Sequence, residues 1–142
     1  MLTFTPNSKR TDVGVSLEYL NKVMKRRCTA FVISDFYTRK DFSQELRIAN
    51  KKHDVVAIQI YDPRAKEMPD VGLMKVVDAE TGHEMYIDTH DARLRKEHNK
   101  YWEEREIRLH EMLSLSHVDS VAIATDDDYV KMLMTLFSKR NR

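Results

Sequence analysis

The stretch Cys28-Thr-Ala-Phe-Val-Ile33 decides the fold, because it is an apolar, β-branched run without polar alternation. Such runs are typical of parallel strands that are covered on both faces. Val55-Val-Ala-Ile-Gln-Ile60 repeats the pattern, and Asp62-Pro63 ends it, since proline cannot donate to a strand ladder. A third apolar run extends from Val118 to Ala124. The sequence therefore predicts three buried strands.

Between these strands, apolar residues recur at helical spacing, which predicts helices. Residues 15–24 form the first such segment, and Asp41 with Gln44 predicts a capping box at the start of the second. A long charged helix is expected from about Ala92 to Leu113, and Thr125 is expected to begin a last helix. The predicted buried side chains are Phe42, Leu46 and Ala49 in the second helix, Leu94, Tyr101, Ile107 or Arg108, and Met112 in the long helix, and Val130, Leu133, Met134 and Phe137 in the last.

Residues 73–77 and 84–87 read as the two arms of a β-hairpin, with Gly82 in the turn. Strands separated by helices run parallel with right-handed crossovers. The sequence thus predicts one α/β domain over residues 1–142, a three-layer helix–sheet–helix sandwich with three parallel strands plus a hairpin. Three strands are few for such a fold, and the chain starts with a helix, which suggests that the sheet lacks its other half.

Composition narrows the functional class of the chain. Lys and Arg number 24 against 23 Asp and Glu, a balance unlike the basic excess of general nucleic-acid binders. The one cysteine, Cys28, excludes an internal disulfide and is interpreted as a small buried hydrophobe. The sequence shows neither a signal peptide nor an apolar run long enough to span a membrane. We expect a cytoplasmic protein that binds neither membrane nor nucleic acid.

Ligands of parallel sheets bind beyond the carboxyl ends of the strands. Ser34-Asp35, Asp62 and Asp126 to Asp128 fall there. The last cluster and Asp62 are interpreted as helix-cap and turn residues, whereas no adjacent helix start requires Asp35. The three glycines are too few for a phosphate loop, and no His-Glu-x-x-His or Cys-x-x-Cys motif occurs. We therefore expect no enzymatic activity and no cofactor.

The segments around Asp35 resemble the bacterial domain of unknown function 58 family, whose fold is von Willebrand factor A-like and hence Rossmann-like. The matching segments are Thr11-Asp-Val-Gly-Val-Ser-Leu-Glu-Tyr-Leu20, Ala30-Phe-Val-Ile-Ser-Asp-Phe36, His53-Asp-Val-Val-Ala-Ile58, Asp62-Pro63, Pro69-Asp-Val-Gly72, Asp78-Ala-Glu-Thr-Gly82, Tyr86-Ile-Asp-Thr89 and Leu136-Phe-Ser-Lys-Arg140. The chain resembles the C-terminal half of the family domain. The resemblance implies a single, partial von Willebrand factor A-like domain.

Folds of this kind carry a metal-ion-dependent adhesion site built from three loops. The resemblance implies that Thr11 supplies the second element and Asp35 the third, while the first, an Asp-x-Ser-x-Ser motif, is missing. Asp41-x-Ser43 opens a helix and lacks the second serine. Mg²⁺ prefers octahedral oxygen coordination, so one hydroxyl and one carboxylate are too few ligands. We predict no tight Mg²⁺ binding by this chain alone, and Mg²⁺ is implied only for the intact domain.

The favoured function is a non-enzymatic protein-interaction module in which Thr11, Asp12, Ser34 and Asp35 form the contact surface. The resemblance implies work beside a MoxR-type AAA+ ATPase in the assembly or remodelling of other proteins. Strand 28–34 would lie at an open apolar edge, which predicts a homo-oligomer through that edge.

Two other functions compete with this interpretation. Asp35 could accept a phosphoryl group as in a receiver domain, but the required acidic pair and lysine are not evident. Clusters at Lys22 to Arg27, Lys51-Lys52 and Lys139 to Arg142 could bind nucleic acid, although cations are ordinary at helix C-termini.

Overall fold

The computed structural model describes residues 12–38, 40–78 and 81–140. Its helices are α1 (Val13–Val23), α2 (Ser43–Lys52), α3 (Pro63–Lys66), α4 (Ala92–Leu115) and α5 (Tyr129–Arg140), and its strands are β1 (Thr29–Ser34), β2 (Asp54–Tyr61), β3 (Leu73–Val77), β4 (Glu84–Asp88) and β5 (Asp119–Ala124). Their order confirms the predicted alternation of helices, strands and a hairpin, with the short α3 as an addition. Among these residues, no helix has the length and apolar character needed to cross a membrane.

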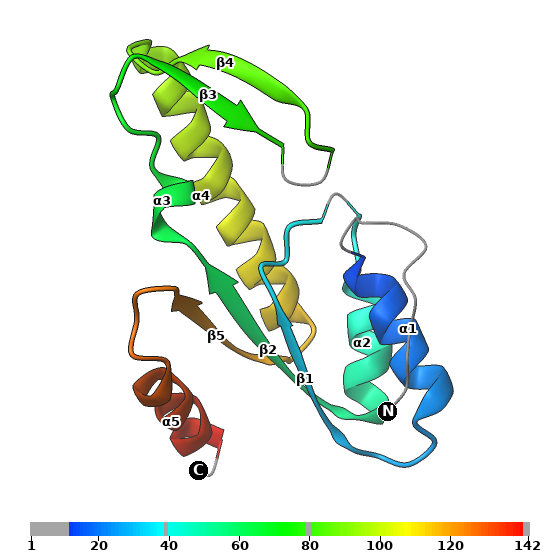
Figure 1. Cartoon of the computed structure of the whole chain (residues 1–142). Coiled ribbons are helices and arrows are strands. Elements are labelled where there is room, and N and C mark those ends of the chain that lie inside the picture. Colours follow the sequence, from blue (N-terminus) through cyan, green and yellow to red (C-terminus); the bar gives the residue numbers. More distant parts are fainter. Residues whose placement is uncertain (1–11, 39, 79–80, 141–142) are drawn as a thin grey trace.

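β1, β2 and β5 form the predicted parallel sheet in the order β1-β2-β5 (Figure 1). The register pairs Thr29 with Asp54 across β1 and β2, and Val56 with Asp119 across β2 and β5. β2 therefore lies in the middle of the sheet. Within the described part of the chain, β1 and β5 are its two edges.

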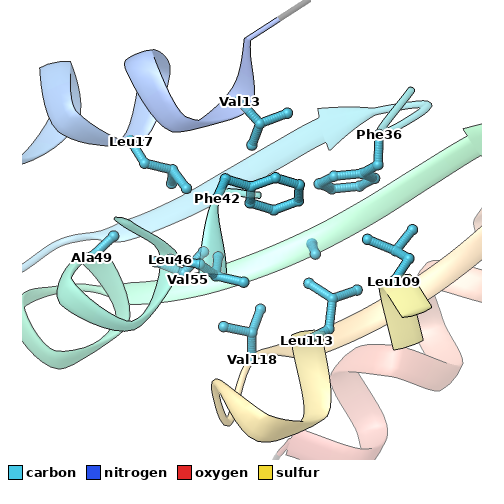
Figure 2. Close-up of a cluster of buried hydrophobic side chains, with 11 residues drawn as sticks. Val13, Leu17, Phe36, Phe42, Leu46, Ala49, Val55, Leu109, Leu113 and Val118 are labelled. Atoms are coloured by element: carbon cyan, nitrogen blue, oxygen red, sulfur yellow. The ribbon is translucent and has the colours of Figure 1, made fainter. Parts of the chain in front are cut away.

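Helices cover both faces of this sheet, which confirms the predicted sandwich. α1 and α2 lie on one face, where Val55 and Ala57 of β2 join a buried cluster with Leu46 and Ala49 of α2 (Figure 2). Leu109 and Leu113 of α4 extend the same cluster. α5 packs on the opposite face, where the rings of Phe31 and Phe137 meet edge to face with centroids 6.0 Å apart.

The cluster explains why these elements are stable together. Leu17 and Leu46 are almost completely withdrawn from water. Full burial of such a side chain contributes about 1.5–3 kcal/mol to the free energy of unfolding. Phe42, Leu46 and Ala49 are all buried, so the predicted inner side of the second helix is confirmed.

β1 departs from the prediction that both of its faces are covered. Its burial alternates along the strand, and Phe31 and Ile33 are 48% and 65% exposed on the α5 side. α5 lies against β5, so it leaves this part of the β1 face open. Cys28 just before the strand is partly exposed rather than buried.

Two predicted helix faces are only partly correct, although Met112 of α4 packs against the core cluster as predicted. α4 buries Leu109 and Leu113, whereas Tyr101 and Ile107 are about half exposed. α5 buries Leu136, while three of the side chains assigned to its inner face are exposed: Val130, Met134 and Phe137. The spacing of apolar residues correctly identified both helices as amphipathic. The apolar stripe on each helix is, however, wider than the part of the described sheet that it covers.

The predicted helix starts shift by a few residues. α2 begins at Ser43 with Phe42 as its N-cap, and the Asp41 carboxylate instead accepts the Ser43 N–H at 2.9 Å. α5 begins at Tyr129, not at Thr125. The Asp128 carboxylate accepts the N–H groups of Val130 and Lys131 at 3.1 and 3.2 Å, which satisfies donors of the first turn.

β3 and β4 form the expected antiparallel hairpin, with Leu73 opposite Asp88 and Val77 opposite Glu84. Gly82 has a φ of +70°, which suits the turn predicted for it. Figure 1 shows the hairpin beside the start of α4, away from the three-stranded sheet. Lys75 and Glu84 form an ion pair across it at 2.7 Å.

The end of α4 stores backbone strain. Beyond the C-cap Ser116, His117 has a φ of +54°, and the N–H groups of His117 and Val118 bond to the carbonyls of Ser114 and Leu113. This is the Schellman arrangement, whose left-handed position is normally glycine. A side chain in that conformation carries a steric penalty of about 1 kcal/mol.

Replacing His117 by glycine should therefore stabilise the protein. We expect His117→Gly to raise the free energy of unfolding by about 0.5–1 kcal/mol, the steric gain being partly offset by the greater freedom of glycine in the unfolded chain. Urea titration followed by circular dichroism measures the change. His117→Ala keeps a Cβ and should bring no gain, and an equal gain in both variants would contradict the explanation.

Candidate functional site

Ser34 and Asp35 shape a tight loop at the carboxyl end of β1. The Ser34 hydroxyl accepts the Phe36 N–H, and one Asp35 carboxylate oxygen accepts the Tyr37 N–H, both at 2.9 Å. The Ser34 hydroxyl donates to that same Asp35 oxygen at 3.5 Å. These bonds hold both side chains at the end of the strand, where parallel sheets bind their ligands.

Phe36 adopts a backbone conformation that a phenylalanine seldom takes. Its φ is +53°, yet the residue is buried and its ring stacks on Phe42 with centroids 6.0 Å apart. A left-handed phenylalanine persists only where the surrounding structure fixes it. The contact with Phe42 supplies that constraint from the core.

An arginine of α4 holds the same loop through a hydrogen bond. Arg105 Nη2 donates to the carbonyl of Asp35 at 3.0 Å. Its guanidinium lies over the rings of Tyr37 and Trp102, 4.7 and 4.8 Å from their centroids. Both distances suit cation–π attraction. The carboxyl end of β1 therefore carries a polar loop beside an aromatic–arginine stack, named here the Arg105 stack (Tyr37, Trp102 and Arg105).

No pattern in the sequence led to the Arg105 stack. Trp102 and Arg105 are three residues apart on a helix, a spacing that brings side chains together and could have indicated their contact. No sequence pattern connects either residue with Tyr37, because that contact depends on how α4 crosses the sheet.

Thr11, the other predicted metal ligand, lies outside the described residues. Its neighbour Asp12 is the N-cap of α1 and accepts the Val15 N–H at 3.2 Å. Lys40, in the loop that follows Asp35, pairs with the Asp12 carboxylate at 2.5 Å. The hydrogen bond from Lys40, helped by the bond from Val15, lowers the pKa of Asp12 below its ordinary value. The ion pair thus links the start of α1 to the loop after β1.

Three other carboxylates at the strand ends serve local structure: Asp62, Asp127 and Asp128. Asp62 is the N-cap of α3, and its pairing with Arg64 lowers the pKa of its carboxyl. Asp127 accepts the N–H of Ala124 at 2.8 Å. Asp128 accepts at the first turn of α5, so each of these side chains has a local partner.

The described residues do not fit a tightly bound Mg²⁺ ion. Nowhere in residues 12–38, 40–78 and 81–140 do three or more His, Cys, Asp or Glu side chains gather as a metal site. Asp35 offers one carboxylate, of which one oxygen already accepts hydrogen bonds, and Ser34 adds one hydroxyl. Mg²⁺ demands near-octahedral oxygen coordination. An acidic cluster around Asp35, which a receiver-like site requires, is likewise missing from these ranges.

The ion pair between Asp12 and Lys40 predicts how the stability of the fold depends on pH. The lowered pKa of Asp12 gives stability that is present above the ordinary pKa near 4 and is lost as pH falls through the lowered value. Lys40→Met should therefore lower the free energy of unfolding at pH 7 and have a smaller effect at pH 2.5. Urea titrations at the two pH values measure this.

Lys22→Met provides the matched control for this prediction. Lys22 pairs with Glu18 at 3.9 Å on the exposed side of α1, the helix whose N-cap is Asp12. Its loss should change stability little at either pH. Equal effects of Lys40→Met at both pH values would contradict the assigned role of Asp12.

Comparisons with known proteins place the chain in a family. A family model described as "Protein of unknown function DUF58" matches residues 1–108. The uncharacterized protein MAV169 of Mycobacterium avium is 28% identical over 137 residues, which cover 96% of this chain and 80% of that protein. Uncharacterized proteins of Mycobacterium tuberculosis (Rv1480) and Mycobacterium bovis (Mb1516) are each 39% identical over 77 residues, 54% of this chain and 24% of theirs.

The chain thus spans about a quarter of the length of these last two relatives. No solved structure gives a significant match. Because the family model covers residues 1–108 of the 142, and the motifs around Asp35 indicate the same family, the chain belongs to the DUF58 family, whose function is unknown.

Proposed function

We propose that this chain is a non-enzymatic protein-interaction module that associates with a second copy of itself along the outer edge of β1. The observation that carries the proposal is the exposure of this strand. Among the described residues β1 has a hydrogen-bonded neighbour only in β2, and Phe31 and Ile33 stand open on one of its faces. Unpaired strand edges with apolar side chains are templates for pairing with another chain.

The surface beside this edge supports association. Phe137 of α5 contacts Phe31 and is itself partly open, and Met134 on the same helix is 66% exposed. Aromatic residues and methionine are enriched at protein interfaces. Pairing through β1 would continue the sheet into the second copy and withdraw Phe31 and Ile33 from water.

A second contact surface lies at the carboxyl end of β1. Ser34 and Asp35 there adjoin the Arg105 stack, and Thr11 and Asp12 complete the surface that the family resemblance implies. Tyrosine, tryptophan and arginine are the residue types that most often dominate binding energies at interfaces. The partner that we propose for this surface is a MoxR-type AAA+ ATPase acting on the assembly or remodelling of other proteins in the cytoplasm.

Self-association through β1 is tested by a charge on its open face. Ile33→Lys replaces a side chain that is already 65% exposed, so the fold should persist. We expect the wild-type chain to sediment as a dimer at tens of micromolar and Ile33→Lys to weaken the dimer at least about tenfold, since desolvating a lysine opposes burial. Analytical ultracentrifugation over a concentration series measures both.

Ile48→Lys is the matched control, because Ile48 is half exposed on α2, over the other face of the sheet. This variant should dimerise like the wild type. A wild-type chain that stays monomeric, or equal weakening by both substitutions, would contradict association through β1.

The incomplete donor set makes a separate prediction about Mg²⁺. Two protein oxygens cannot replace enough of the ion's hydration shell. Isothermal titration of the chain with MgCl₂ should give no binding at micromolar affinity, and Asp35→Asn should leave the titration unchanged. Micromolar binding that Asp35→Asn abolishes would show that the chain completes the site.

A further inference from the structure

Cys28 and His53 lie side by side at the amino ends of neighbouring strands. The carbonyl of Cys28 accepts the N–H of Asp54 at 2.8 Å, and the register of β1 and β2 begins one residue later. This places the Cys28 sulfur 3.4 Å from Nδ1 of His53. The interpretation of Cys28 as a small buried hydrophobe is therefore wrong, because the residue is partly exposed and its sulfur has a polar partner.

His53 is an unusual neighbour for a thiol. It is the C-cap of α2, is completely buried, and its Nε2 has no hydrogen-bond partner. A buried N–H without an acceptor is rarer in proteins than a buried acceptor without a donor. The unpartnered Nε2 therefore favours the tautomer with the ring proton on Nδ1, which faces the sulfur. In this tautomer His53 donates to Cys28, and the S–H proton points elsewhere.

The acidic residue next to His53 is engaged by an arginine rather than by the pair. The nearest acidic residue along the chain, Asp54, is paired with Arg140, which also contacts Asp119. Arg26 and Arg27 immediately precede Cys28 in the chain. A donor held against a sulfur is a feature of reactive cysteines, and here the contact with His53 would supply it.

We propose that Cys28 is a modification site at which a hydroperoxide oxidises the thiol to a sulfenic acid, with His53 as the positioning residue. In this step the sulfur attacks one peroxide oxygen, the S–O bond forms and the O–O bond breaks. The thiol proton ends on the leaving oxygen, which departs as water or an alcohol. Sulfur loses two electrons and the peroxide gains two.

The product has a defined fate. Cys28 is the one cysteine of these 142 residues, so none of them offers a second thiol to resolve the sulfenic acid. It persists until a thiol from outside condenses with it to form a mixed disulfide. The site precedes β1, so such an adduct would stand at the start of the edge strand. The test of this oxidation does not depend on self-association, because the modification is detected in the mass of the single chain.

The test compares the rate of oxidation of the folded and unfolded wild-type chain. Each is treated with hydrogen peroxide, the sulfenic acid is trapped with dimedone, and intact mass is followed over time. Although Cys28 is partly shielded in the folded chain, we expect it to react there about tenfold faster than in urea, where the contact with His53 is lost. A folded rate equal to or below the unfolded rate overturns the proposal.

Two substitutions separate activation from simple packing. His53→Phe keeps a ring of similar size but removes both nitrogens, and it should lower the folded rate about tenfold. His53→Asn retains an N–H donor near the position of Nδ1 and should recover most of the wild-type rate. Circular dichroism establishes that each variant is folded. Equal rates in wild type and folded His53→Phe would show that His53 plays no part, and Cys28→Ser should give no adduct.

Discussion

The pairing of β2 with strands on both sides is the constraint on which the rest of the structure depends. Its register to β1 and to β5 brings the carboxyl ends of all three strands to one edge of the sheet. Val55 and Ala57 on one face anchor α1, α2 and α4, while Val56 and Ile58 on the other are buried beside α5. Every feature argued to matter for function takes its position from this strand.

β1 has a polar contact at each of its ends. At its amino end, the alignment with β2 sets Cys28 against His53. At its carboxyl end, Asp35 meets Arg105 of α4, a residue 70 positions later in the chain. Between these ends, the face of the strand that carries Phe31 and Ile33 is open. An edge strand with chemistry at both ends and apolar side chains between them is suited to association that a modification could disturb.

The sequence predicted the strands, the hairpin and their order, because continuous apolar runs and turn residues are local signals. The prediction that Val130, Met134 and Phe137 are buried was wrong. A hydrophobic side chain favours burial, but the sequence does not reveal whether another helix or strand lies over it. Cys28 with His53, and Tyr37 with Arg105, could not be paired from the sequence. Both contacts depend on strand register or on the crossing of a helix, and neither leaves a spacing pattern along the chain.

The loop after β1 is fixed before any partner arrives, which bears on how it could bind one. Phe36 is held in a left-handed conformation by its stack on Phe42, and Arg105 holds the carbonyl of Asp35. A loop clamped in this way loses little conformational freedom on binding, so more of its contact energy is available for affinity. The same clamp limits how far the Asp35 carboxylate can turn toward an incoming group. The site thus favours a partner whose surface already matches it over one that must reshape it.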